Sequence, residues 1–489
     1  MIPHSDVVIV GAGSAGSVLA ERLSADPACM VTVLESGVTG SYIESMIRAA
    51  GHLPIGPDSP VVHRYRTLLT QEPPRLAFLV RGSTVGGSGA VNGGYFCRAL
   101  PDDFDSPAIP GWSWRDVLPH YRATTADLDV GAAFGSARIR FRRVAELSCR
   151  SREFTDAVIG SGFRWLPDLN AEPTGVNEPP GVGAVPLNIV DGLRISPGDV
   201  FLGEAASRPN LELKLGTRAL RVRMDGPRAV GVDAVGPDGP MQLGADRVVL
   251  SAGAIETAHL LMQSGIGPAT ALRASGIEVS VDLPVGQSCW DHPEWLVPTS
   301  EVSTGPSDHL PVLEVVLSAD GLEIRPYTKG FGSMLRAPSS AEPDRLHIGV
   351  ALMHPGSRSR ITPVSADPSF APRIEHRYDS AAGDIADLRR GHQLLVDVMG
   401  SKTVMEQPKW STSQHLCGSA PMGVDGDERA VVDPQCRVLG VDRLWVVDGS
   451  VLPSPLSRGP HATIVMLGHR AARFVRGADW RDSHCREGR

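Results

Sequence analysis

The chain has 489 residues, which is more than one hydrophobic core usually supports, so we expect two or three domains. Hydrophobic residues make up 42% and charged residues 21%, the balance of an ordinary globular protein. With 55 acidic against 47 basic side chains the net charge is −8, which excludes a broadly basic surface and predicts no nucleic-acid partner.

The 7 cysteines form neither a CxxC pair nor an even disulfide framework, so we expect no metal site and no secreted disulfide scaffold. The first residues lack the basic region, apolar run and cleavage site of a signal peptide, and no apolar run elsewhere approaches the length of a bilayer span. We therefore expect no transmembrane segment and a cytoplasmic location, with peripheral contact at the inner face of the cell membrane left open.

Two strands and a helix are predicted at the N-terminus, in DVVIVGAGSAGSVLAERLSADPACMVTVLESG. Residues 7–10 form a short apolar run that ends at a glycine, residues 14–24 have helical apolar spacing, and residues 31–34 form a second apolar run. This order predicts a β-α-β unit, the beginning of an α/β nucleotide-binding domain.

A glycine-rich turn joins the first strand to the helix, with glycines in the spacing GxGxxG. They allow a tight bend, a close approach to a pyrophosphate and helix–strand packing, while the helix N-terminus faces the anion. Glu35 ends the second strand, where its carboxylate can accept both hydrogen bonds of a ribose diol. The residues expected to hold the nucleotide are Gly11, Gly13, Ser14, Ala15, Gly16 and Glu35. The alternative is a glycine-rich turn in an unrelated α/β domain, and this unit alone does not separate FAD from NAD.

Further motifs, in a fixed order along the chain, are typical of one family of flavoenzymes. Residues 81–105, RGSTVGGSGAVNGGYFCRALPDDFD, and residues 251–268, SAGAIETAHLLMQSGIGP, resemble the two signature stretches of the glucose-methanol-choline (GMC) oxidoreductases. The later HLCGSAPMG and AVVDPQCRVLGVDRLWVVDGSVLP resemble the closing block of that family. The resemblance extends over residues 6–474.

The resemblance implies an α/β fold: a Rossmann-like FAD-binding domain assembled from discontinuous segments, plus a substrate domain built on an antiparallel sheet with helices. The FAD-binding domain is expected over residues 1–140, 195–290 and 425–489. The substrate-binding domain is expected over residues 141–194 and 291–424.

The apolar pattern agrees with this division. Further strands of the nucleotide domain are predicted around Val222, Val232 and Val248, followed by a helix over residues 255–263. Strand-like runs separated by polar turns predict an antiparallel substrate sheet, with its outer faces solvated, over residues 312–316, 322–324 and 346–352.

The resemblance also implies which residues contact FAD beyond the first turn. The stretch 85–94 has five glycines, so its main chain can lie against a flat ligand, with Asn92 near the isoalloxazine. Some family members tether FAD through a histidine just before this asparagine; here that residue is Val91, so we expect noncovalent, dissociable FAD. Asp448, after the strand at 444–447, is implied beside the ribityl and pyrophosphate groups, its alternative role being a turn or cap aspartate. The further contacts expected are Val85, Gly87, Asn92, Gly93, Gly94, Ala219, Asp448, Gly449 and Ala462.

Two histidines are candidates for the chemistry. Oxidising an alcohol by hydride transfer requires a group that takes the hydroxyl proton, and imidazole suits that task near neutral pH. His415 matches the family motif H-x-x-G-T, with Ser419 at the threonine position, and is expected to be the proton acceptor. His461 aligns with the family's second active-site position and follows Pro460 at a helix start, where a lowered pKa would make it a neutral donor or auxiliary base. We assign no chemistry to His469, deeper in the same helix.

The substrate is suggested by a subgroup resemblance. The stretches SCWDHPEW, IRPYTKGF and STSQHLCGSAPMG are most similar to the mycofactocin-associated GMC oxidoreductases. That resemblance implies an alcohol substrate, mycofactocinol, reoxidised to mycofactocinone, with electrons passed to a respiratory-chain acceptor. The alternatives are a simple alcohol or choline-type dehydrogenase or oxidase, a hydroxynitrile-type lyase that keeps FAD without redox chemistry, and a nicotinamide-dependent dehydrogenase.

Overall fold

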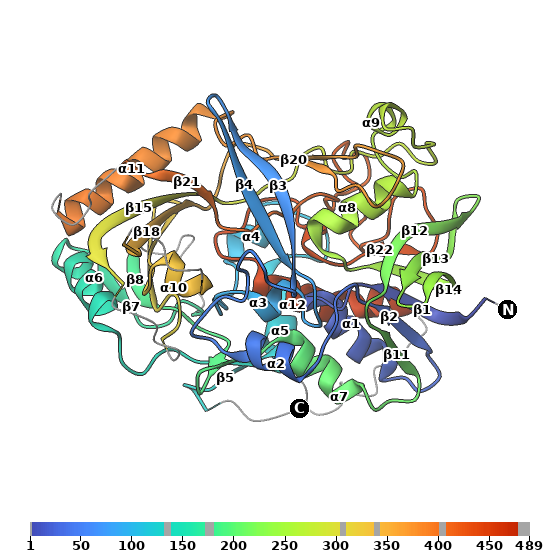
Figure 1. Ribbon diagram of the computed structural model, residues 1–489, viewed down its shortest axis with the longest axis horizontal. Coiled ribbons are helices and arrows are strands. Elements are labelled where there is room, and N and C mark those ends of the chain that lie inside the picture. Colours follow the sequence, from blue (N-terminus) through green and yellow to red (C-terminus); the bar gives the residue numbers. More distant parts are fainter. Residues whose placement is uncertain are drawn as a thin grey trace.

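The computed structural model describes residues 2–131, 138–171, 180–303, 310–336, 343–400 and 407–477. Cys485, with residues 478–489 of the expected FAD-binding domain and short parts of the other expected segments, lies outside the described residues. Two seven-stranded sheets, here called sheet I and sheet II, lie on opposite sides of the molecule (Figure 1). A four-stranded sheet, sheet III, rises between them (Figure 1).

Sheet I contains the predicted β-α-β unit. Its elements are β1 (His4–Val10), α1 (Ser14–Ser24), β2 (Val31–Leu34), β11 (Leu211–Lys214), β12 (Arg218–Asp225), β13 (Arg228–Gly236), β14 (Gly239–Leu250) and β22 (Leu444–Val446). The strand order is β11-β2-β1-β14-β13-β12, with β22 beside β14. β1 pairs in parallel with β2 and β14, as in an open nucleotide-binding sheet, and ligands of such sheets bind outside the carboxyl ends of the strands.

The helices at this carboxyl edge carry much of the expected site. The helix predicted from residue 255 is α8 (Gly253–Gln263), which begins two residues earlier. The last helix, α12 (His461–Arg476), packs against α1 and α5 (Trp114–Thr124). The predicted start of the last helix, directly after Pro460, is therefore confirmed.

Sheet II is antiparallel except where β7 pairs with β8, and it contains the strand-like runs of the expected substrate domain. Its strand order is β21-β15-β18-β17-β16-β8-β7. The strands are β7 (Arg164–Leu166), β8 (Gly181–Ala184), β15 (Pro293–Val302), β16 (Val315–Ala319), β17 (Leu322–Pro326), β18 (Arg345–Leu352) and β21 (Lys409–Thr412). The run predicted at 312–316 starts as a strand only at Val315, since the carbonyl oxygen of Val312 accepts from Thr328 outside the ladder.

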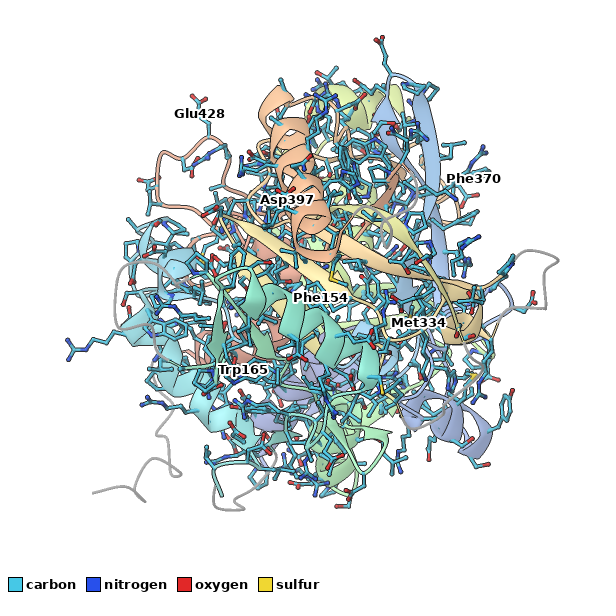
Figure 2. The ribbon with its side chains drawn as sticks, turned by 90° about the vertical axis from the view of Figure 1, so that its left-hand side faces the viewer. Phe154, Trp165, Met334, Phe370, Asp397 and Glu428 are labelled. Carbon is cyan, nitrogen blue, oxygen red and sulfur yellow. The ribbon has the colours of Figure 1, made fainter. Side chains whose placement is uncertain are left out.

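The expectation that the outer faces of this sheet are solvated is wrong. One face is covered by α6 (Cys149–Gly160) and α11 (Ala382–Met399), which lie in front of the sheet in Figure 2. Phe154 of α6 is fully buried in the core beneath them. The alternate residues along the strands, including Glu294 and Glu323, are also buried. The polar residues that alternate along these strands therefore face the interior of the protein, and Glu294 lines an internal cavity there.

Sheet III joins segments that the expected domain division separates. Its strands are β3 (Val62–Gln71), β4 (Pro74–Gly82), β19 (Arg360–Thr362) and β20 (Arg373–Glu375). β20 pairs in parallel with β3, so a strand from the 291–424 segment extends a hairpin from the 1–140 segment. The domain boundaries themselves stay a prediction, and sheet III is one place where the two sets of segments share hydrogen bonds.

Short elements connect the sheets. The other helices are α2 (Ser41–Arg48), α3 (Ser88–Val91), α4 (Pro101–Asp105), α7 (Gly203–Ala205), α9 (Ala269–Ala274) and α10 (Phe331–Leu335), with a π-helical turn η1 (Gly198–Leu202) and a 3-10 turn η2 (Gly449–Val451). The remaining strand pairs are β5 (Thr125–Asp127) with β6 (Ile139–Phe141) and β9 (Ile189–Val190) with β10 (Leu193–Arg194). Within the described ranges, none of the helices combines the length and hydropathy that a bilayer span requires.

The contact between α1 and α12 depends on Gly468. A Cβ atom at this position would lie 2.8 Å from the carbonyl oxygen and 3.0 Å from the Cα of Ala15, both backbone atoms that cannot move independently of α1. The close approach brings the start of α12 near the glycine-rich turn after β1.

Gly468→Ala should therefore lower the free energy of unfolding by about 1–3 kcal/mol, as overpacking of a filled interface does. The matched control is Gly383→Ala in α11, where a Cβ would meet nothing within 4 Å. That change should stabilise the protein by about 0.5 kcal/mol through helix propensity. Denaturant titration of both variants and the unchanged protein measures the two changes in the free energy of unfolding, which should have opposite signs. Equal stability of the two variants would contradict this account of the contact.

Candidate active site

A single continuous cavity of about 570 Å³ runs from the turn after β1 to the inner face of sheet II. Both candidate catalytic histidines line it, and so do most of the predicted cofactor contacts. The predicted residues in its wall are Gly11, Gly13, Ser14, Ala15, Glu35, Gly87, Asn92, Gly93, Ala219, His415, Asp448, Gly449 and His461. The fold thus collects at one place residues that are spread over more than 400 positions of sequence.

Four predicted contacts do not line the cavity: Gly16, Val85, Gly94 and Ala462. Gly16 packs helix on turn, since a Cβ there would lie 1.9 Å from the carbonyl oxygen of Gly11. Gly94 lies against Ile189, and Ala462 is buried within α12. These residues lie behind the cavity wall, and any direct contact between them and a cofactor stays a prediction.

The turn after β1 has the geometry of an anion site. Gly11 has φ +100°, and a Cβ there would lie 2.4 Å from the carbonyl oxygen of Ser251, so only glycine fits. Gly13 caps α1 without any side-chain hydrogen bond to the first turn. The unpaired N–H groups of that turn are therefore available to a phosphate, and the helix dipole favours its negative charge.

Glu35 is fixed at the edge of the same cavity. It is buried, its Oε2 accepts from the backbone N–H of Ala12 at 2.9 Å, and its Oε1 accepts from Gly37 at 2.8 Å. Burial raises the pKa of Glu35, and these two amide donors oppose the rise. The two backbone donors hold the carboxylate in a fixed position at the cavity wall.

Asp448 is the cap aspartate that the sequence allowed. Its Oδ1 accepts from the N–H of Ser450 at 2.8 Å, while its Oδ2 accepts from Gly253 at 2.9 Å and from the Thr257 hydroxyl at 2.6 Å. Burial raises the pKa of this carboxyl group. Asp448 therefore joins the start of α8 to η2 at the cavity wall.

His461 is the first residue of α12 and is held by Asn92. The Asn92 side-chain oxygen accepts from Gly94 N–H at 2.9 Å, so its amide nitrogen donates to His461 Nδ1 at 3.0 Å. Burial lowers the pKa of His461 to about 4, which leaves the imidazole neutral with its proton on Nε2. This Nε2 is buried and has no partner among the described residues. His461 is therefore an unused hydrogen-bond donor in the cavity wall.

His415 follows β21 and is paired with a second histidine that the sequence interpretation missed. Its Nδ1 lies 2.9 Å from Nδ1 of His292, so its Nε2 is the nitrogen available to a ligand. The pKa of His415 lies well below its usual value of 6.5, because of burial first and then of His292, Arg325 and Arg81. Both candidate catalytic histidines are thus neutral imidazoles near neutral pH. The available signal for His292 was its position in the stretch SCWDHPEW.

Asp291 fixes the two paired histidines. Its Oδ1 accepts from the backbone N–H groups of His292 and His415, each at 2.8 Å. Its Oδ2 accepts from Thr412 at 2.6 Å and from Tyr378 at 2.9 Å. One buried carboxylate therefore holds together the start of β15 and the end of β21.

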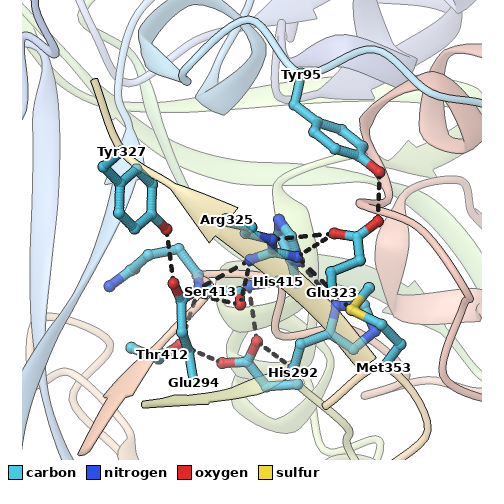
Figure 3. Close-up of polar contacts among 12 residues, drawn as sticks. Tyr95, His292, Glu294, Glu323, Arg325, Tyr327, Met353, Thr412, Ser413 and His415 are labelled. Atoms are coloured by element: carbon cyan, nitrogen blue, oxygen red, sulfur yellow. Dashed lines mark hydrogen bonds and ion pairs between the residues drawn. The ribbon is translucent and has the colours of Figure 1, made fainter. Parts of the chain in front are cut away.

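A buried ion cluster, also missed from the sequence, forms the cavity wall on sheet II (Figure 3). Arg325 Nη1 lies 3.3 Å from Oε2 of Glu294, and Arg325 Nη2 lies 2.7 Å from Oε2 of Glu323. Burial alone would raise the pKa of Glu323, but Arg325 and Arg458 outweigh it and hold that pKa at about 2. We name Glu294, Glu323, Arg325 and Arg458 the ion cluster.

His469 lies outside this arrangement. Its Nδ1 is 2.8 Å from Nδ1 of His120 on α5, and it does not line the cavity. The structure also has no group of three or more His, Cys, Asp or Glu side chains able to hold a metal ion within the residues it describes.

Comparison with known proteins identifies the family. The GMC oxidoreductase family models match residues 5–294 and 355–468. The chain is 38% identical to an uncharacterised GMC-type oxidoreductase in the thcA 5′ region of Rhodococcus erythropolis, over 97% of this chain and 99% of that one. It is 30% identical to an oxygen-dependent choline dehydrogenase of Sinorhizobium medicae, over 97% and 96% of the two chains.

Solved structures agree with this assignment. Pyridoxine 4-oxidase from Mesorbium loti superposes with a TM-score of 0.83 at 27% identity, covering 96% of this chain and 98% of that one. Formate oxidase of Aspergillus oryzae, at 23% identity with a TM-score of 0.85 and coverage of 97% and 98%, shares the fold. The chain therefore belongs to the GMC oxidoreductase family, and it is an FAD-dependent oxidoreductase that acts on CH–OH donors.

Proposed function

We propose that His415 accepts the hydroxyl proton of the alcohol while His461 donates a hydrogen bond to the same oxygen. The observation that carries this proposal is the pair of neutral imidazoles in one cavity wall, each with a lowered pKa. A neutral imidazole can take a proton, and a neutral N–H can hold developing negative charge without first losing its own proton.

FAD fits the residues of the cavity. The free N–H groups at the start of α1 suit the pyrophosphate, and Glu35 suits the ribose. The unpaired Nε2–H of His461 leaves a donor for the reacting end. Bound FAD supplies the hydride acceptor, and the protein supplies binding, orientation and proton transfer.

The roles of the two ring nitrogens of His415 follow from its partner. For Nε2 to accept a proton, the imidazole must carry its own proton on Nδ1 and donate it to His292 Nδ1. His292 then acts as a positioning residue that selects this tautomer. The fixed backbone of both residues, through Asp291, keeps Nε2 aimed at the cavity without rotation of the ring.

For the native substrate we propose mycofactocinol, oxidised to mycofactocinone, with electrons passed on to a respiratory-chain acceptor. The support is the likeness of SCWDHPEW, IRPYTKGF and STSQHLCGSAPMG to the mycofactocin-associated subgroup. Two of these stretches contain His292, Glu294 and Arg325, and the third contains His415, so the resemblance falls on the cavity wall itself. The second candidate is a choline-type or simple alcohol, because choline dehydrogenases match 97% of the chain.

Anaerobic mixing of the purified yellow enzyme with mycofactocinol should bleach the flavin, because a bound alcohol delivers its hydride to FAD. A panel of simple alcohols and choline, mixed in the same way, should bleach it more slowly. Bleaching by choline but not by mycofactocinol would reverse the ranking of the two candidates. A substrate that is consumed while the flavin stays oxidised would indicate the lyase alternative.

His415→Ala should lower the rate constant of flavin reduction by the best alcohol of that panel by about 10²–10⁴-fold, since the proton acceptor is lost. In the unchanged enzyme this rate constant should stay level as the pH falls from about 8 to about 6, where an ordinary imidazole would become protonated. The reason is the lowered pKa, which keeps His415 neutral there. Anaerobic stopped-flow absorbance measures both, with His469→Ala as the control that should keep the full rate. A midpoint near the ordinary histidine pKa would contradict the assignment.

We propose that FAD is held without a covalent bond, because Val91, which occupies the tethering position, is a buried residue of α3 without a nucleophilic group. Acid precipitation should leave all yellow colour in the supernatant, measured by absorbance and by mass spectrometry of the pellet. Flavin that remains on the precipitated polypeptide would require a different tether.

A further inference from the structure

The ion cluster balances its own charges inside the cavity wall. Its side chains are between 1% and 6% exposed, two of them acidic and two basic. Arg325 contacts both carboxylates, and Arg458 Nη1 lies 3.0 Å from the second oxygen of Glu323. Glu294 and Arg325 themselves line the cavity, so a bound alcohol meets this neutral arrangement directly.

Both carboxylates are also saturated with hydrogen bonds. Tyr327 donates its hydroxyl to Oε1 of Glu294 at 2.7 Å, and Ser413 donates to Oε2 at 2.8 Å. Tyr95 donates to Oε1 of Glu323 at 2.6 Å (Figure 3). Neither carboxylate therefore keeps an oxygen without a donor.

The other charged groups of the cavity wall are engaged as well. Glu256 accepts from the Tyr65 hydroxyl at 2.6 Å and lies 3.6 Å from Arg218. Arg81 Nη1 donates to Gln414 at 3.2 Å and to a main-chain oxygen, and the nearby Asp291 carboxylate offsets its charge, while its buried Nη2 has no partner among the described residues. Around the expected position of the alcohol, the described wall thus offers hydrogen-bonding and apolar surface but no carboxylate in need of a counterion.

We infer that the ion cluster makes the site selective for an alcohol whose head group is uncharged, and that it discriminates against the quaternary ammonium of choline. This inference rests on the proposed function, in which the alcohol binds between His415 and sheet II. A charged head group would lose its hydration on entry and find no unpaired opposite charge to compensate. An uncharged head group can pack on Leu296, the next inward residue of β15 after Glu294, and a polar one can donate hydrogen bonds to the Tyr95 and Tyr327 hydroxyl oxygens.

The test uses three alcohols of similar size and different charge: choline, its carbon isostere 3,3-dimethylbutan-1-ol, and the anion hydroxypivalate. Each is titrated against the spectrum of the oxidised flavin in the holoenzyme, and each is mixed anaerobically to measure flavin reduction. Binding is thus read even where turnover is slow. The unchanged enzyme should bind 3,3-dimethylbutan-1-ol at least about tenfold more tightly than choline or hydroxypivalate, because only the neutral ligand avoids an unpaired buried charge.

Two variants should move this preference in opposite directions. Arg325→Met leaves Glu294 without a cation and should shift the choline to 3,3-dimethylbutan-1-ol binding ratio by at least about tenfold toward choline. Glu294→Gln keeps an acceptor for Tyr327 but leaves a net positive charge, and it should shift binding toward hydroxypivalate. Arg325→Lys keeps the positive charge and should retain the preference for 3,3-dimethylbutan-1-ol over both charged ligands. It replaces the methionine variant in the test if that variant does not fold.

The control for loss of an arginine is Arg150→Met, which breaks an ion pair with Glu301 on the same side of the molecule but away from the cavity. It should leave the order of the three ligands unchanged. Tighter binding of choline by the unchanged enzyme, or variants that keep the original order, would overturn the inference. If none of the three alcohols and not mycofactocinol reduces the flavin, the proposed function fails instead, while the binding order still decides the charge selectivity.

Discussion

The buried carboxylate of Asp291 is the interaction on which the geometry of the active site depends. One of its oxygens accepts hydrogen bonds from the backbone N–H groups of His292 and His415. The other accepts hydrogen bonds from the hydroxyl groups of Tyr378 and Thr412. A buried carboxylate is stable only when its oxygens are satisfied in this way. Because the donors to Oδ1 are main-chain groups, the carboxylate fixes the path of the chain at both histidines. The imidazole contact between them is a consequence of that path.

Burial also determines the protonation states of the histidines around the cavity. Burial lowers the pKa of His415, His461 and His292, because the cationic imidazole loses more hydration than the neutral one. Arg81 and Arg325 add to this effect at His415. The guanidinium groups can remain charged because carboxylates accompany them, whereas the imidazoles of these three histidines have no carboxylate at hydrogen-bond distance among the described residues. The cavity wall therefore keeps fixed charges in compensated clusters and leaves the imidazoles of His415 and His461 neutral.

Much of the nucleotide-binding half could be predicted from the sequence, because its signals are local. The glycine turn, α1 and β2 lie within one short segment, and Pro460 marks the start of α12. The substrate-facing wall could not be predicted in the same way. The alternation along β15 and β17 says which residues share a face, but it is the same whether the polar face meets water or a closed cavity. Arg458 reaches Glu323 from 135 positions away, and such contacts have no local signal.

Helix α12 connects the nucleotide-binding part of the site with the part that contains the candidate catalytic histidines. Its first residue, His461, contacts Asn92 of the glycine-rich loop, and its middle residue, Gly468, contacts α1 directly behind the nucleotide turn. A change at the start of α1 would therefore also move His461, the proposed hydrogen-bond donor to the alcohol. On the other side, the hairpin of β3 and β4, which leads into the glycine-rich stretch, contacts the loop before His415 through Gln414. Gln414 accepts from Val80 N–H at 2.9 Å and completes that connection. His461 through Asn92 and His415 through the neighbouring Gln414 are thus both attached to the nucleotide-binding half, so a short, irregular loop can carry the proposed proton acceptor in a fixed position.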